Sequence, residues 1–346
     1  MKKRVAWLDV LRLSAAFLVI VNHTNSGIFQ STTPANGSWW ASLLWYYISK
    51  TAVPLFVMVS GACLLPRRDG YRKNGARIVR MLLVLALFSY LFFLYDAWAQ
   101  GVLWPCAVDV GAFASLLWTA RCGDAYWYLY FYLGLLLMLP LLQRMAAGLS
   151  RGDCLYLMGL CFGLDAVWPL AAHYAPALQF PAYFFVPMFS AYIGLFFAGH
   201  FLRQSAPVSR RQMLWALGTL AVSLALSVGL TRIEYGLGTP KYWFMDDRMH
   251  PSAPTIAAAI SMAVLARGLC KDVQSPRALD TAAGCSFGIY LFEEMVIYLT
   301  EAPLYLPLCS HMPAIAAAVV WELAVFAICF ALTLLCKRVP GLKRLL

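Results

Sequence analysis

Three residues that can do chemistry lie within the first apolar stretch, WLDVLRLSAAFLVIVNHTNSG, residues 7–27. They are Asp9, Arg12 and His23. On a helix each residue advances by about 100°, so Arg12 and His23 differ by only about 20°, and Asp9 lies within about 60° of Arg12. The rise of about 1.5 Å per residue places His23 about 16 Å further along the helix than Arg12. The three side chains therefore share one face at two depths.

Histidine is suited to acyl or proton transfer, because its pKa of about 6.5 lets its ring take up or release a proton near neutral pH. Alternatively, a ring nitrogen can carry an acyl group covalently. Arg12 offers a permanent cation that can bind a carbonyl, stabilise developing negative charge or hold a carboxylate. Asp9 is the expected partner of Arg12.

Ionisable residues are costly inside a membrane span, at about 2.5–3.5 kcal/mol each on insertion scales, which makes three on one stripe a functional hypothesis. The structural alternative is an interfacial Asp9–Arg12 pair, together with a His23 that only packs against a neighbouring helix.

The composition is that of a polytopic membrane protein. The 346 residues are 62% hydrophobic and only 12% charged, with a mean hydropathy of +0.70. Lys2, Lys3 and Arg4 before an apolar run resemble a signal peptide. The run is long and carries charges, however, so we interpret it as an uncleaved first span.

Hydropathy predicts an all-α bundle of about ten spans. They cover residues 7–29, 43–65, 78–98, 125–142, 154–171, 182–202, 212–230, 253–269, 285–300 and 313–336. Of the 27 Lys and Arg residues, 21 fall on alternate connections and at the two ends of the chain. The positive-inside rule then places both termini in the cytoplasm. The net charge of +11 is therefore explained by topology and does not indicate nucleic-acid binding.

The loops on the other side differ in character. Residues 231–252 combine charges with aromatic rings such as Trp243, which suits a sugar face and its hydroxyls; the alternative is a solvated loop with interfacial aromatics. Residues 109–118 are apolar but too short to span, so we expect them to lie in the interface. The ten cysteines show no metal-binding spacing, so no metal is expected. Cys106 and Cys122 share a loop and are either bridged or free.

Several motifs occur together in a fixed order. The first is the Arg-x10-His of residues 12–23, followed by PLFVMVSGACLL at residues 54–65 and an RxxR formed by Arg77 and Arg80. WYLYFYLGLLLMLPLL at residues 127–142 and SFGIYLFE at residues 286–293 follow. Over nearly its whole length the chain resembles the acyltransferase-3 family of integral-membrane O-acyltransferases, and in particular the branch that acetylates surface-glycan sugars.

The resemblance implies a single membrane domain over residues 1–346, in a bundle of about ten spans and without an appended soluble domain. It implies transfer of an acyl group, usually acetyl, from cytoplasmic acyl-CoA to a hydroxyl of a surface glycan or lipid-linked saccharide. The protein would sit in the inner membrane, with acyl-CoA as a substrate and no permanently bound cofactor. On this reading the catalytic residues are His23, Arg12, Asp9 and Glu293.

Donor and acceptor residues follow from the same comparison. We expect the donor phosphates and thioester to meet Arg77, Arg80, Arg68 and Ser60. Ser60 and its neighbouring glycine offer a hydroxyl and a close backbone approach, or alternatively only permit close helix packing. We expect the acceptor to meet Lys50, Trp127, Tyr290 and Trp243. Lys50 is alternatively a residue that extends outward to the membrane surface.

Two positions depart from the family motifs. A histidine common before span four is replaced by Ala125, and one common in span nine is replaced by Glu293. A carboxyl near the middle of the bilayer must be protonated, paired or hydrated. Glu293 is therefore expected either to orient His23 by accepting from its ring N–H or to pair with Arg12. Glu294, about 100° away, is the other carboxyl that could face the bundle.

Other functions fit some of these features. A transporter or channel could use buried Arg, His and Glu as a substrate or proton path, and the transferred group could be another acyl group such as succinyl. The sequence leaves open the acceptor, the oligomeric state and the choice between base and covalent carrier for His23.

Overall fold

The computed structural model describes residues 5–24, 26–101, 109–119, 123–180, 190–238, 250–271 and 273–346. The regular secondary structure of this part of the chain is entirely helical, apart from a single isolated β-bridge between Val5 and Gln274. The all-α class predicted from hydropathy is confirmed. Trp243, Cys106 and Cys122 lie outside the described residues.

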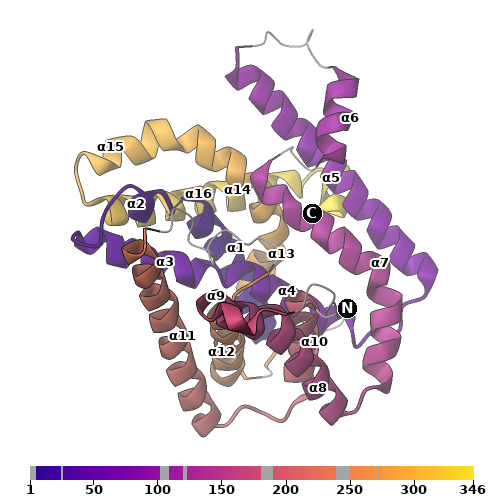
Figure 1. The fold of residues 1–346 in the computed structure, drawn as a ribbon. Helices are drawn as coiled ribbons and strands as arrows, with labels where there is room; N and C mark the ends of the chain where they lie inside the picture. Colours follow the sequence, from indigo (N-terminus) through magenta and orange to yellow (C-terminus); the bar gives the residue numbers. More distant parts are fainter. Residues whose placement is uncertain are drawn as a thin grey trace.

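The helices follow one another along the chain as Figure 1 shows by colour. The first half contains α1 (Ala6–Thr24), α2 (Ser26–Gln30), α3 (Gly37–Ser49), α4 (Ala52–Leu64), α5 (Tyr71–Ala99), α6 (Val110–Trp118), η1 (Asp124–Tyr126), α7 (Trp127–Gly148), α8 (Arg151–Phe162), η2 (Gly163–Val167) and α9 (Trp168–Tyr174). The second half contains η3 (Pro176–Leu178), α10 (Ala191–Gln204), α11 (Arg210–Gly236), α12 (Ala253–Cys270), α13 (Arg277–Gly284), α14 (Ser286–Thr300), η4 (Glu301–Tyr305), α15 (Leu306–Cys309), α16 (Ala314–Cys336) and α17 (Pro340–Leu345).

Within the described residues, eight helices, some joined across a short break, are long and apolar enough to cross a membrane. A ninth candidate is the pair of α13 with α14–α15, which is bent by 48°. The remaining predicted span, residues 182–202, corresponds to α10, of which 14 residues are described; residues 181–189 lie outside the described part. The prediction of about ten spans agrees with this arrangement.

Local signals explain where the helices begin. Ser, Asn and Asp side chains accept a hydrogen bond from the first turn and so satisfy an otherwise unpaired backbone N–H. The N-caps with such a bond are Asn36, Asp109, Ser150, Ser190, Ser209 and Ser252. Because Asn36 caps α3, the second span starts at Gly37 and not at residue 43 as predicted. The pair Trp39 and Trp40 thus lies in the first turn of a helix and not in a loop.

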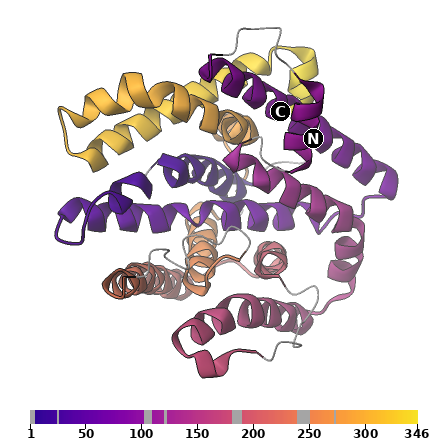
Figure 2. The same cartoon turned by 45° about the horizontal axis from the view of Figure 1, so that its top comes forward.

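The helix α1 lies at the centre of the bundle, between α4, α12, α14 and α16 (Figures 1 and 2). Its small and branched residues Ala15, Ala16, Ile20 and Val21 have no exposed surface. Burial on all sides of a helix is expected at the core of a large helical protein. This position lets α1 present its polar stripe to several other helices at once.

The helices α4 and α10 cross in close contact because glycines meet backbone. A Cβ built on Gly61 would lie 1.8 Å from the carbonyl oxygen of Phe196, and one on Gly199 would lie 1.8 Å from that of Met58. Glycine at an interface lets two helix backbones approach closely. The two reciprocal contacts fix α10 against the helix that carries Ser60.

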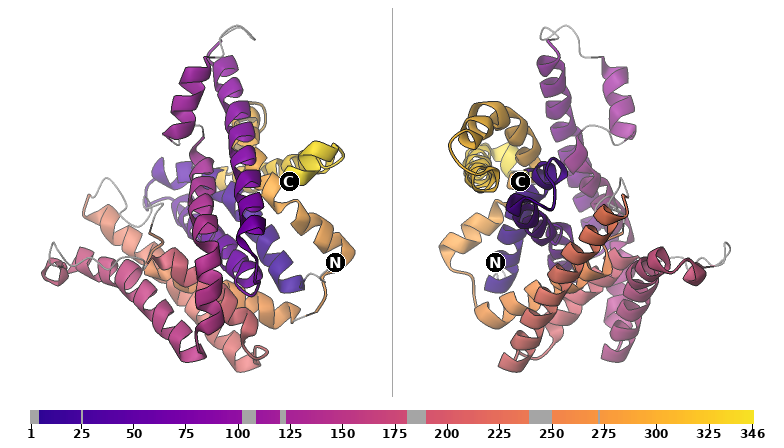
Figure 3. Two further views of the ribbon diagram at one scale, coloured as in Figure 1. Left: turned by 90° about the vertical axis from the view of Figure 1, so that its right-hand side faces the viewer. Right: turned by 60° about the vertical axis from the view of Figure 1, so that its left-hand side comes forward.

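Several helix ends near the basic segments are joined to one another or to the ends of the chain. The structure joins them by a small set of bonds: Ala6 N to the Val273 carbonyl at 3.0 Å, the Gln143 amide to the Leu64 carbonyl at 2.8 Å, the Arg80 guanidinium to the Leu345 carbonyl at 2.8 and 3.2 Å, and Lys337 to the Gly284 carbonyl at 2.5 Å. We call the side of the bundle that carries Arg68, Arg77, Arg80 and Lys337 the basic face. In the side views of Figure 3, the end of α5 and the neighbouring α6 extend beyond the other helices.

Candidate active site

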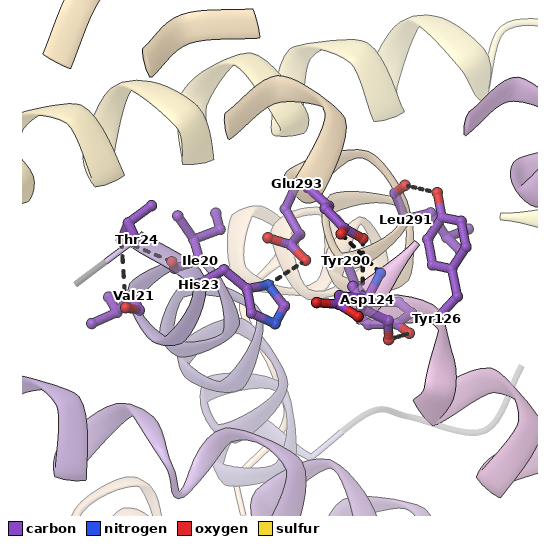
Figure 4. A network of polar contacts seen from close by, with 11 residues as sticks. Ile20, Val21, His23, Thr24, Asp124, Tyr126, Tyr290, Leu291 and Glu293 are labelled. Carbon is purple, nitrogen blue, oxygen red and sulfur yellow. Dashed lines mark hydrogen bonds and ion pairs between the residues drawn. The ribbon is translucent and has the colours of Figure 1, made fainter. Parts of the chain in front are cut away.

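His23, in the last turn of α1, pairs with Glu293 of α14. The Nδ1 atom of His23 lies 2.8 Å from Oε1 of Glu293, as Figure 4 shows. Glu293 has no exposed surface, while a quarter of the His23 side chain is exposed. The ionised form of Glu293 only accepts hydrogen bonds, and beside that form the proton of the pair is on Nδ1. The other ring nitrogen, Nε2, then keeps its lone pair and is the atom that can act as a base.

The second carboxylate oxygen of Glu293 has no hydrogen-bond partner among the described residues, and neither has the side-chain oxygen of Asn22, beside His23. Both atoms are buried. Buried polar atoms of this kind normally find a protein, water or ligand partner. Because the other oxygen of Glu293 bonds to His23, this unpartnered oxygen marks a polar position next to the imidazole.

Arg12 lies at the other end of the stripe with different partners. Its Nη1 donates to Oδ1 of Asp9 at 2.6 Å and its Nη2 to Sγ of Cys63 at 2.9 Å. Asp9 also accepts a bond from Ser275 at 2.5 Å. The predicted Asp9–Arg12 pair is confirmed. Of the two partners expected for Glu293, the structure contains His23; the alternative pairing with Arg12 is wrong because the two residues lie at different depths.

Glu294 is also buried but faces another part of the molecule. Its carboxylate accepts from the backbone N–H groups of Asp124 and Ala125 at 2.9 and 3.0 Å (Figure 4). The Tyr290 hydroxyl donates to the Ala125 carbonyl at 2.7 Å, and the Tyr126 hydroxyl to that of Leu291 at 3.0 Å. These four bonds fix the start of α7 against α14, the helix that carries Glu293.

Gly123 permits this close approach. Its φ angle of 123° is one that residues with a side chain rarely adopt. A Cβ at this position would lie 3.1 Å from Oε2 of Glu294 and would also meet the Tyr126 ring. A glycine is thus required where the chain turns into η1.

Two of the predicted acceptor residues lie near His23. Lys50, the C-cap of α3, lies 4.7 Å from the centre of the Tyr46 ring and close enough to His23 for their charges to interact. Tyr290 is held on α14 one turn before Glu293 and Glu294. Trp127, the first residue of α7, packs on the rings of Tyr128 and Phe131.

The predicted donor residues lie at or near the basic face. Arg77 pairs with Asp69 at 2.5 Å, and its Nη1 is buried without a partner among the described residues. Arg80 donates to the Leu345 carbonyl of α17, and Arg68 is exposed. Ser60 lies in α4 and is partly buried. Arg77 and Arg80 thus have partners within the protein, which the sequence did not indicate.

The charge of Asp69 is well stabilised. Burial alone would raise its pKa, but hydrogen bonds from Lys73 at 2.6 Å and from Arg77 outweigh that effect and lower the pKa to about 2. Asp69 is therefore ionised at neutral pH and holds Arg77 in place.

The described residues contain no group of three or more His, Cys, Asp or Glu side chains that could hold a metal ion.

A family model described as an acyltransferase domain, Acyl_transf_3, matches residues 5–338. The chain belongs to the acyltransferase-3 family. Comparison with curated proteins gave no match, and comparison with solved structures gave none either. As a member of this family with multiple apolar helices, the protein is a multi-pass membrane acyltransferase.

The two positions at which this acyltransferase departs from the motifs it resembles lie together in space. Ala125 accepts from Tyr290 and donates to Glu294, and Glu293 is the residue before Glu294. Both departures therefore fall around the His23 pair. The sequence indicated each of them separately, but nothing in it indicated that they share one hydrogen-bonded network.

A further buried carboxyl lies near the end of α1 that carries His23. Glu322 of α16 accepts from the Thr24 hydroxyl and from the Trp45 indole, both at 2.9 Å. Thr24 directly follows His23, so this group ties the end of α1 to α3 and α16. In the sequence, Glu322 stands alone in an apolar span. Such a residue needs partners from other helices, and this is the signal that indicates the contact.

Proposed function

We propose that this acyltransferase moves an acetyl group from acyl-CoA at the basic face to a hydroxyl of a cell-surface glycan or lipid-linked saccharide. The observation that supports the proposal best is the bond from His23 Nδ1 to the buried Glu293 carboxylate. It leaves Nε2 as the base, in the same arrangement by which a carboxylate orients a catalytic histidine in other acyl-transfer enzymes.

The proposed reaction is an acyl transfer in which His23 moves the proton. Nε2 of His23 takes the proton from the acceptor hydroxyl, and the oxygen attacks the thioester carbonyl. The carbon–sulfur bond then breaks, and the proton passes from the imidazolium to the CoA thiolate. Glu293 holds the ring and stabilises its transient positive charge. The products are the acetyl ester and CoA.

The charge distribution supports the direction of transfer. Arg77, Arg80 and Arg68 provide cations on the side where, by the positive-inside rule, the cytoplasm and its acyl-CoA lie. Further along α1, the second oxygen of Glu293, which has no partner among the described residues, lies beside His23 and suits a hydroxyl group. We place the protein in the inner membrane with both termini in the cytoplasm, so that donor and acceptor reach the site from opposite faces.

Replacing His23 tests the proposal. The His23→Ala variant is expected to release CoA from acetyl-CoA about 10²- to 10⁴-fold more slowly, which is the usual contribution of a general base. Binding of acetyl-CoA, measured by thermal stabilisation, should persist. The matched control is His311→Ala, because His311 is exposed and bonds only to its own turn.

Turnover close to that of the parent in His23→Ala would disprove the role of His23. Comparing the turnover of succinyl-CoA with that of acetyl-CoA shows which acyl group the protein transfers. Mass spectrometry after incubation without acceptor distinguishes a base from a covalent carrier, since only the carrier accumulates acyl-histidine. Mass spectrometry of surface glycans from a deletion strain, complemented with parent or variant, identifies the acceptor.

A further inference from the structure

The short helix α17 lies beside α5 and brings a backbone carbonyl to one of the predicted donor arginines (Figure 1, yellow). The guanidinium of Arg80 donates to the carbonyl oxygen of Leu345, from Nε at 3.2 Å and from Nη2 at 2.8 Å. The side chains of Leu345 and Leu346 are partly buried and pack against the main hydrophobic core. Helix α17 therefore occupies a guanidinium that the proposed function assigns to the donor phosphates.

The two arginines of the RxxR motif differ in what holds them. Arg77 donates to the ionised carboxylate of Asp69 at 2.5 Å. The partner of Arg80 among the described residues is the neutral carbonyl of Leu345. A phosphate carries negative charge and offers a guanidinium a bidentate fit, neither of which a single carbonyl provides. A phosphate therefore replaces the partner of Arg80 more readily than that of Arg77.

Helix α17 is also easy to displace, because it is short. It spans six residues, Pro340–Leu345, and helices shorter than about 12 residues are marginal on their own in water. Its position thus depends on the packing of the two leucines and on the bond to Arg80. The side chain of Arg80 is exposed, so an anion from the solvent reaches it. The exposed Lys343 and Arg344, in the last turn of α17, add positive charge that attracts such an anion.

A purely structural role for Arg80 is the alternative. The last carbonyls of a helix have no partner within it, and a cation near this end of a helix is favourable. Arg80 would then only cap α17. The two roles differ in one respect, since a cap keeps its place when CoA binds, whereas a competitor of the phosphates leaves.

We propose that α17 is an autoinhibitory element, which covers Arg80 in the structure and is displaced by the phosphates of acyl-CoA. This inference rests on the proposed function, since it assumes acyl-CoA as the donor. The apparent donor affinity is then lowered in proportion to the fraction of molecules in which Arg80 is uncovered. Loosening α17 thus raises the donor affinity and leaves the chemistry at His23 unchanged.

The first test follows hydrogen exchange of residues 343–346 in the parent protein. The amide of Lys343 donates to the Val339 carbonyl and that of Leu346 to the Leu342 carbonyl, both at 2.9 Å. Saturating CoA should speed their exchange by about 2- to 13-fold, the factor that the loss of one hydrogen bond represents. S-acetyl-pantetheine, which lacks the nucleotide and its phosphates, should leave the exchange unchanged. Exchange that stays constant or slows with CoA would overturn the proposal, and an equal effect of both compounds would contradict displacement by the phosphates.

The second test loosens α17 without changing any charge. The double variant Leu345→Ser with Leu346→Ser removes the apolar packing and keeps Arg80, Lys343 and Arg344. The Kd of CoA, measured by calorimetry, should fall by about 2- to 13-fold. The matched control makes the same double change in Arg80→Ala, where it should leave the Kd of CoA as it is in Arg80→Ala alone, because no guanidinium is left to uncover.

Equal Kd values in the parent and in the folded double variant, with normal turnover of acetyl-CoA, would overturn autoinhibition but leave the proposed function intact. A higher Kd in the double variant would show that α17 supports the donor site, which also contradicts the proposal. Should the double variant fail to fold, hydrogen exchange in the parent decides. A parent protein that neither binds CoA nor turns over any acyl-CoA would overturn the proposed function, and autoinhibition with it.

Discussion

Replacing Glu293 by glutamine tests the pairing on which the proposed chemistry depends. The change keeps the shape of the side chain and removes its charge. The glutamine oxygen can still accept from Nδ1 of His23, but its amide group can also donate to Nδ1, which leaves the proton on Nε2 and removes the base. We therefore expect Glu293→Gln to lower kcat by two separate effects.

The size of the charge effect follows from the geometry. A carboxylate about 4 Å from the centre of an imidazolium stabilises it by about 4 kcal/mol at an effective dielectric constant of 20, which is an upper bound for the transition state. Since 1.4 kcal/mol is a factor of ten, kcat should fall by about 10- to 10³-fold. Donor affinity should stay within about threefold, because the predicted donor contacts lie towards the basic face.

The assay follows CoA release with a thiol reagent and donor binding by calorimetry, both on purified protein. Glu293→His should retain part of the activity, because a neutral imidazole can accept from Nδ1 of His23. Glu301→Gln is the matched control, since Glu301 is exposed at the start of η4. Turnover of Glu293→Gln within twofold of the parent would refute the reasoning. A loss of donor binding as large as the loss of kcat would show that Glu293 stabilises the folded protein and has no specific role in acyl transfer.

Two further predictions concern the basic face and the α4–α10 contact. The double variant Arg77→Lys with Arg80→Lys keeps the charge but loses the guanidinium fork, so the KM of acetyl-CoA should rise about tenfold while that of S-acetyl-pantetheine stays constant; equal donor affinity in parent and variant would exclude phosphate binding. Gly199→Ala places a methyl group against backbone and should lower the free energy of unfolding by about 1–3 kcal/mol or more, measured by thermal denaturation in detergent. Gly229→Ala, which meets nothing within 4 Å, should be neutral or stabilising, and equal effects of the two would contradict the packing argument.

The sequence predicts the spans well because hydropathy depends only on composition and length. It does not predict where a span breaks. The second span divides at Lys50 and Thr51 into α3 and α4, although the apolar stretch continues through both. Backbone groups freed at such a break are satisfied by local bonds, here from Lys50 N to the Tyr46 carbonyl and from the Thr51 hydroxyl to that of Ile48, which hydropathy does not measure.

The candidate site was only partly predictable for a related reason. Counting residues along a helix gives depth, so it correctly limited the partners of Glu293 to a few residues. The rotation of α14 about its axis is set by packing between distant segments, and so the choice between Glu293 and Glu294 needed the structure. The contact of Arg12 with Cys63 joins residues 51 positions apart and had no sequence signal at all.

The arrangement along α1 gives a physical reason for placing Arg12 and His23 on one face at two depths. Arg12 is fixed by Asp9 and Cys63 near the basic face, where its charge is paired and its cost in the membrane is lowered. His23 is fixed about 16 Å further along by a carboxylate from another helix. A single buried helix thus holds one group near the basic face, where we propose that the donor binds, and another on the side proposed for the acceptor. In the proposed reaction the two substrates enter from different faces, and both the acceptor hydroxyl and the thioester carbonyl have to reach the imidazole.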